Sequence, residues 1–161
     1  MKRSALLTLL LASMIDTAAL AASDIVNISV RGTLTRPPCV LASSSTLTVD
    51  FGDVRTDQVA SAAPIAVPVT LTCPAGSSLS VGLSSSNNTF TDTVARTTAN
   101  NLGVSLTWTS NNTAANLANV KRALTGQSGT VDLSLSARLV QRGELTPGSF
   151  TSTLVMNIEY L

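Results

Sequence analysis

Residues 26–39 read VNISVRGTLTRPPC, and this stretch decides the fold assignment. Its apolar and polar residues alternate, which is the period-two pattern of a half-buried β-strand. The apolar row consists of Val26, Ile28, Val30 and Leu34. Gly32 interrupts this row, and Pro37 and Pro38 end the strand just before a cysteine. Because no two-residue hairpin turn follows, the stretch is predicted to pair with a partner that is distant in the sequence.

The remainder of the chain continues the alternation. It is seen in TLTVDFG at 46–52, in IAVPVTLTC at 65–73, in VDLSLSARLV at 131–140 and in GSFTSTLVMNIEYL at 148–161. Pro68 inside the second of these segments indicates an edge position or a bulge. No segment beyond residue 21 has a convincing 3.6-residue apolar repeat, so the predicted class is all-β. Seven to nine short strands favour a Greek-key, immunoglobulin-like sandwich in one domain.

The first 21 residues have the pattern of a removable export signal. Lys2 and Arg3 precede an apolar run that is too short to span a bilayer, and small residues follow it. We expect cleavage after Ala21 or Ala22. The exported protein is then predicted to have no segment that inserts into a membrane.

Charge and cysteine content limit the expected partners and predict a disulfide. Removal of Lys2, Arg3 and Asp16 from ten basic and nine acidic residues leaves eight of each, with no charge run. Nucleic acid and anionic membranes are therefore not expected as partners. In an exported chain, Cys39 and Cys73 are predicted to form one disulfide.

Catalysis is not expected from this inventory of side chains. The chain has no histidine, and Lys121 is its only lysine after the signal. Triads and most metal sites are thereby excluded. Asp50, Asp53 and Asp57 have the spacing of no known calcium loop or glycosidase pair. The sequence predicts no enzyme activity, no metal and no cofactor.

A family resemblance rests on several of these segments together. ISVRGTLTRPPC, TLTVDFGDV, the second cysteine in VTLTCP, Gly148 and the penultimate Tyr160 resemble a pilin subunit of the chaperone–usher pathway. The motifs RG-x-L-x-x-PPC and VDFG are most similar to those of minor tip subunits of the adaptor kind, as in P-type and type 1-like pili. The chain is too short for the extra lectin domain of a two-domain tip adhesin.

The resemblance implies an incomplete immunoglobulin-like sandwich that lacks its last strand, with an open apolar groove. It implies an N-terminal extension at 22–38 and a pilin domain at 39–161. In this family a periplasmic chaperone fills the groove, and the extension of a neighbouring subunit then replaces the chaperone's strand. The implied partners are that chaperone, the outer-membrane usher and neighbouring pilins, and the implied location is a fimbria on the cell surface.

The same resemblance assigns residues to two roles. The implied donor-strand residues are Val26, Ile28, Val30, Gly32 and Leu34. The implied residues of the groove edge, which the chaperone also grips, are Gly148, Phe150, Leu154, Met156, Ile158, Tyr160 and Leu161.

Two other interpretations remain open from the sequence. The first alternating stretch could be the first strand of the chain's own sandwich, and the last row could be ordinary core packing. The protein could then be a free-standing exported module that binds carbohydrate at its Ser/Asn loops or near Trp108.

Overall fold

The structure is a computed structural model that describes residues 24–35 and 37–161. The predicted export signal at 1–21 lies outside the described residues. The chain divides between Leu34 and Thr35 into two units, which are described separately. In the first unit, residues 24–34 form neither a helix nor a strand.

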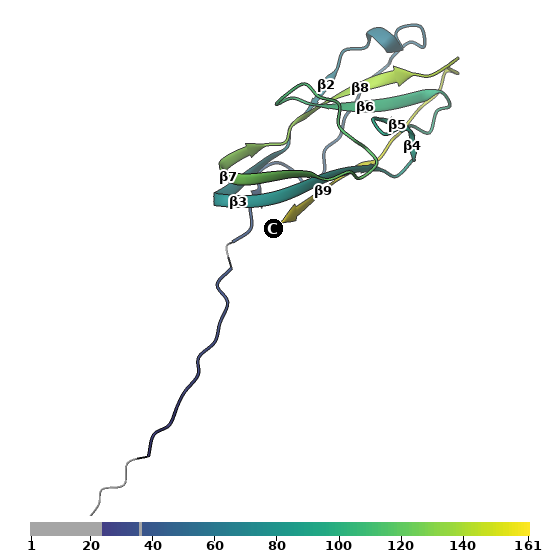
Figure 1. Cartoon of the computed structure of the whole chain (residues 1–161). Coiled ribbons are helices and arrows are strands. Elements are labelled where there is room, and N and C mark those ends of the chain that lie inside the picture. Colours follow the sequence, from purple (N-terminus) through teal and green to yellow (C-terminus); the bar gives the residue numbers. More distant parts are fainter. Residues whose placement is uncertain (1–23, 36) are drawn as a thin grey trace, which may run out of the picture. The chain divides into compact units, whose positions relative to one another are not determined.

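The second unit is a β-sandwich. Its elements are β1 (Val40–Leu41), the short 3-10 helix η1 (Val59–Ser61), β2 (Ile65–Val67), β3 (Thr70–Ser85), β4 (Thr89–Thr91), β5 (Val94–Arg96), β6 (Leu102–Trp108), β7 (Arg122–Asp132), β8 (Leu135–Gln141) and β9 (Leu154–Tyr160). Figure 1 shows β3, β7 and β9 in one layer and β5, β6 and β8 in the other. The prediction of an all-β, two-sheet fold is confirmed.

The long strand β3 is the centre of the four-stranded sheet. One edge of β3 pairs with β7, from Thr70 opposite Asp132 to Val81 opposite Arg122. Its other edge is shared by two strands that lie one after the other. β1 pairs near the start of β3, and β9 pairs with the second half, from Leu79 to Ser85.

The second sheet has five antiparallel strands in the order β2-β8-β6-β5-β4. Residues that are opposite each other in an antiparallel ladder share a face. On β6, Leu102, Val104, Leu106 and Trp108 are buried and point to the core. Gly103, Ser105 and Thr107 belong to the other face, so the alternation read from the sequence decides which side is buried.

Residues from both sheets make one hydrophobic core. Its largest fully buried side chains are Leu71, Leu79, Leu117 and Val81. The disulfide between Cys39 and Cys73 is present and lies in this core, where it ties the residue before β1 to the first part of β3. Closing a loop of 34 residues stabilises the fold by roughly 4 kcal/mol if loop-closure entropy dominates.

Two expected strands are divided between the sheets. The segment 65–73 breaks at Pro68, so that β2 joins the five-stranded sheet and β3 the four-stranded one. Proline has no N–H to donate to a ladder, which explains a change of sheet at this residue. The alternating row from Val131 to Leu139 is likewise divided between β7 and β8.

The segment at 46–52 was expected to be a strand and is not one. Val49 and Phe51 are nevertheless half-buried and pack against the core. Their alternation is real, but β1 ends at Leu41 and no described strand lies beside this segment. No helix in the described part of the chain is long and apolar enough to cross a membrane.

Candidate functional site: an open groove and a separate apolar arm

The arm, residues 24–34, has an apolar row that its own chain leaves exposed. Val26, Ile28 and Val30 are 80%, 82% and 89% exposed. Leu34 is also fully exposed. A Cβ added to Gly32 would meet no atom within 4 Å, so nothing among the described residues accounts for the missing side chain there. Among residues 24–35 and 37–161, the apolar row of the arm is therefore not buried.

An apolar cavity opens between β9 and the segment 41–51. Its volume is about 590 Å³. The two walls are formed by residues such as Leu47 and Val49 on one side and Leu154 and Met156 on the other. Core side chains form its floor, among them Val69, Leu83, Val104, Leu106 and Ala137. We call this cavity the groove.

A second, wider cavity of about 910 Å³ continues the groove at its Phe150 end. The two cavities share Val49, Phe51 and Phe150 in their walls, so these residues form the junction between them. Gly148 lines the wide cavity, and a side chain there would meet no atom within 4 Å.

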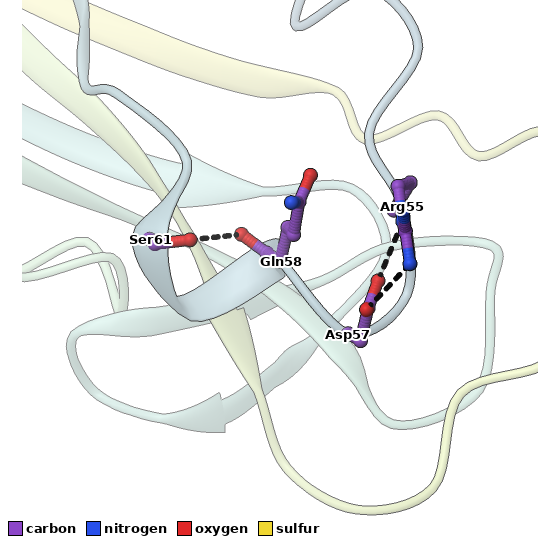
Figure 2. A network of polar contacts seen from close by, with 4 residues as sticks. All are labelled: Arg55, Asp57, Gln58 and Ser61. Carbon is purple, nitrogen blue, oxygen red and sulfur yellow. Dashed lines mark hydrogen bonds and ion pairs between the residues drawn. The ribbon is translucent and has the colours of Figure 1, made fainter.

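A turn stabilised by local polar contacts borders the wide cavity (Figure 2). Arg55 donates two hydrogen bonds to the carboxylate of Asp57, at 3.0 and 2.8 Å. The hydroxyl of Ser61 donates to the backbone carbonyl of Gln58 at 3.0 Å, which links the last residue of η1 to the residue before the helix. Both partners of the ion pair are well exposed, so the pair shapes the turn and adds little to stability.

The backbone of β9 has one open edge. In an antiparallel ladder, every second residue turns its N–H and C=O to the same neighbour. The N–H of Leu161 donates to the carbonyl of Ser78, and the N–H of Ser86 donates to the carbonyl of Thr153. The backbone N–H and C=O groups of the odd-numbered residues of β9 therefore point to β3. Within the described residues β9 pairs with β3 alone, so the even-numbered residues direct their backbone groups to the open edge.

The even-numbered residues also carry the side chains that line the groove. Leu154, Met156 and Ile158 are half-buried and pack against the core. Val155 also borders the groove, but it alternates with these residues, so its side chain lies on the other face and is 45% exposed. Tyr160 and Leu161 are exposed at the end of the chain. Open hydrogen-bonding groups and open apolar side chains thus belong to the same residues of β9.

The structure brings together most of the residues expected at the groove edge. Phe150, Leu154, Met156 and Ile158 line the groove, and Gly148 lines the wide cavity; Tyr160 and Leu161 lie outside both. Sequence reasoning missed the opposite wall at 41–51. The signal for it was present, because Leu47, Val49 and Phe51 alternate next to a segment with no evident strand partner.

The surroundings of Trp108 and the distribution of acidic side chains bear on the alternative of a carbohydrate or metal site. Trp108 is 6% exposed, and its ring packs in the core with the Arg122 guanidinium 5.2 Å from its centre, so no face is free for a sugar. Among residues 24–35 and 37–161, no three cysteine or acidic side chains gather to hold a metal ion.

Comparisons with known proteins agree with this geometry. No curated protein matches the sequence. Among solved structures, the P pilus rod subunit PapA is similar with a TM-score of 0.65 and 15% identity over 78% of this chain and 100% of that one. A second similar structure is a subunit of a chaperone–usher pilus, from work on the molecular basis of rod uncoiling. Its TM-score is 0.62 and its identity 14%, over 89% of this chain and 100% of that one.

The P pilus adaptor subunit PapF is a third similar structure, with a TM-score of 0.58 and 22% identity over 78% of this chain and 97% of that one. At such identities the likeness concerns the fold. The fimbrial protein family, by contrast, matches the sequence itself over residues 28–161, which include most of the arm and the whole sandwich. With an open groove, an exposed apolar arm and this match, the chain belongs to the fimbrial protein family.

Proposed function

We propose that the protein is a structural subunit of a surface fimbria that serves adhesion, assembled by exchange of donor strands. Each subunit gives its arm to a neighbour and receives a strand in its own groove. The observation that carries this proposal is the open edge of β9, which runs along an apolar cavity. A single added strand would satisfy the backbone of this edge and cover the groove.

The arm fits the groove in length and in pattern. Val26–Leu34 and Phe150–Ile158 each contain nine residues, so both span about 27 Å when extended. In both segments the apolar side chains follow a period of two, with one gap in each row, at Gly32 and at Ser152. One strand inserted along β9 could therefore contact the groove with its whole apolar row.

Antiparallel insertion suits the shape of the groove. Val26 would then lie opposite Ile158, and Leu34 opposite Phe150 beside the wide cavity. Gly32 would lie opposite Ser152, close to the junction that Phe51 and Phe150 line. The arm residue without a side chain would then lie beside these two aromatic rings, and Leu34 would lie at the larger cavity.

Burial of the donor side chains supplies the driving force. Each aliphatic side chain that is fully buried contributes about 1.5–3 kcal/mol, so the four together contribute roughly 6–12 kcal/mol before conformational entropy is subtracted. Hydrogen bonds to the open edge of β9 add about 1 kcal/mol each. These magnitudes are sufficient for a stable contact between subunits.

The open groove accounts for the need for a chaperone. An unpaired edge above an apolar cavity invites aggregation until another strand covers it. We propose that a periplasmic chaperone covers β9 first and that the C-terminal carboxylate at Leu161, which is exposed, is held by basic residues of that chaperone. An outer-membrane usher would then exchange the chaperone for the next subunit.

Purification of the mature chain with and without a candidate periplasmic chaperone tests the proposal. We expect a soluble one-to-one complex with the chaperone, and slow oligomerisation of the chain without it. A chain that stays fully monomeric in the absence of a chaperone, without any oligomerisation, would count against donor-strand assembly.

The orientation of the inserted strand has its own test. In a mixture of two variants, Val26→Cys should form a disulfide with Ile158→Cys if the strand is antiparallel. Val26→Cys with Phe150→Cys is the matched control, because a parallel strand would join that pair instead. Cross-linking of the control pair alone would overturn the proposed orientation.

A further inference from the structure

The outer face of the five-stranded sheet carries an aromatic residue that does not belong to the core. Phe90 on β4 is half-buried but is absent from the core cluster, as is Val94 on β5. A Cβ on Gly103 would come within 3.2 Å of the Phe90 ring and 2.6 Å of Val94. Gly103 on β6 is therefore what allows both side chains to lie against the outer surface of the sheet.

Two guanidinium groups converge on this aromatic ring. The guanidinium carbon of Arg96 lies 4.0 Å from the centre of the Phe90 ring, and that of Arg142 lies 5.8 Å from it. Both contacts are within the range of a cation–π interaction. The two positive charges thus lie within about one Debye length of each other and repel, although each is attracted to the ring.

The donors of these two side chains are largely unused. Arg96 donates from Nε to the backbone carbonyl of Thr89 at 3.3 Å, which leaves its terminal nitrogens free. The Arg142 guanidinium donates to no described residue. The two ion pairs among the described residues involve other side chains, and neither Asp92 nor Glu144 is paired with these arginines.

The surrounding face is basic. Arg138 on β8 is opposite Ser105, and Val140 is opposite Gly103, so both side chains share the outer face with Arg96. The outward positions of β5, β6 and β8 include no carboxylate. Since the chain as a whole is close to neutral, this face concentrates positive charge locally.

We propose that Arg96 and Arg142, held over Phe90, bind an oxyanion, that is, a carboxylate, sulfate or phosphate group. A planar guanidinium matches two oxygens of such a group with two parallel N–H donors. One oxyanion between the two side chains would accept from the free nitrogens of both and would remove their mutual repulsion. The group could be a free ion or could be carried by an acidic saccharide.

The test is a titration of the full chain with sodium sulfate at constant ionic strength, followed by NMR at the arginine Nε–H and Phe90 ring signals. We expect saturable shifts at Arg96, Arg142 and Phe90, and none at Arg55. Arg142→Gln should weaken binding at least tenfold. Arg138→Gln is the matched control, because it removes the same charge from the same face away from the ring, and it should weaken binding less than twofold.

A second arm of the experiment uses a heparin oligosaccharide as the probe. Saturation by sulfate alone identifies a site for free ions, and shifts of the same signals by heparin at lower concentration identify a site for the carried group. Either result supports the site. Shifts that do not saturate with either probe, or equal losses in Arg138→Gln and Arg142→Gln, would show a diffuse charge effect and overturn the proposal.

Discussion

The substitution Val30→Asp separates the stability of the subunit from its ability to join a fibre. Val30 is 89% exposed in its own chain, so a polar residue there costs the free subunit little. We expect the free energy of unfolding to change by less than about 0.5 kcal/mol. In a neighbour's groove, the same substitution should strongly weaken binding of the donor strand.

Two terms give the magnitude of the loss. Removal of the buried valine side chain forfeits about 1.5–3 kcal/mol. Keeping an aspartate neutral at pH 7 costs about 4 kcal/mol, since its ordinary pKa lies about three units lower. The donor strand is thus expected to bind about 6 kcal/mol more weakly, which is a factor of roughly 10⁴.

The assay compares Val30→Asp with Ser29→Asp, which adds the same charge on the opposite face of the arm. Urea unfolding of both purified chains measures stability, and the amount of each chain in sheared fimbriae measures incorporation. We expect both variants to be as stable as the wild type and only Val30→Asp to be lost from fimbriae. Normal incorporation of Val30→Asp, or unfolding of that variant on its own, would refute the reasoning.

Three other outcomes follow from the groove, the disulfide and the turn after β7. Met156→Ser should weaken acceptance of a donor strand, whereas Val155→Ser, on the outer face of the same strand, should not; pull-down of a tagged neighbouring subunit distinguishes them. Replacing both Cys39 and Cys73 by serine should lower the free energy of unfolding by about 2–5 kcal/mol, measured by urea titration. Hydrogen bonds from Ser134 lower the pKa of Asp132. The ionised Asp132 carboxylate therefore stabilises the fold above pH 4, and this stabilisation is lost as the pH falls through the lowered pKa. Urea titrations should therefore find Asp132→Asn less sensitive to acid than the wild type between pH 5 and pH 2.

Much of the architecture was predictable because period-two alternation reports directly which face is buried. The rows ending at Trp108 and Leu139 have clear apolar and polar faces, and these faces are inside and outside as predicted. The alternation at Leu154–Ile158 predicted a strand, but the pattern alone did not distinguish core packing from the edge of a groove; only the family resemblance implied that role. The partial exposure of this strand reflects that, among the described residues, β9 pairs on one edge only, which no local pattern reveals.

Other elements were not predictable from local pattern. The hairpin of β4 and β5 is short and rich in threonine, and it has no long alternating apolar row that would identify it in the sequence; β5 pairs with β6 and buries Ala95. The first part of β7 contains Gly126 and Gly129 at positive φ, which obscures a strand in the sequence. The cluster at Phe90 depends on contacts between three strands and has no sequence signature.

The most direct test of the account is amide hydrogen exchange along β9, measured in the monomeric chain and in assembled fibres. If the edge of β9 is open until a donor strand pairs with it, the amides of Leu154, Met156 and Ile158 exchange rapidly in the monomer and slowly in the fibre. Those of Val155 and Asn157, which face β3, should be protected in both. Strong protection of the even-numbered amides in the monomer would contradict the central claim, because the edge of β9 would already be paired without a neighbouring subunit.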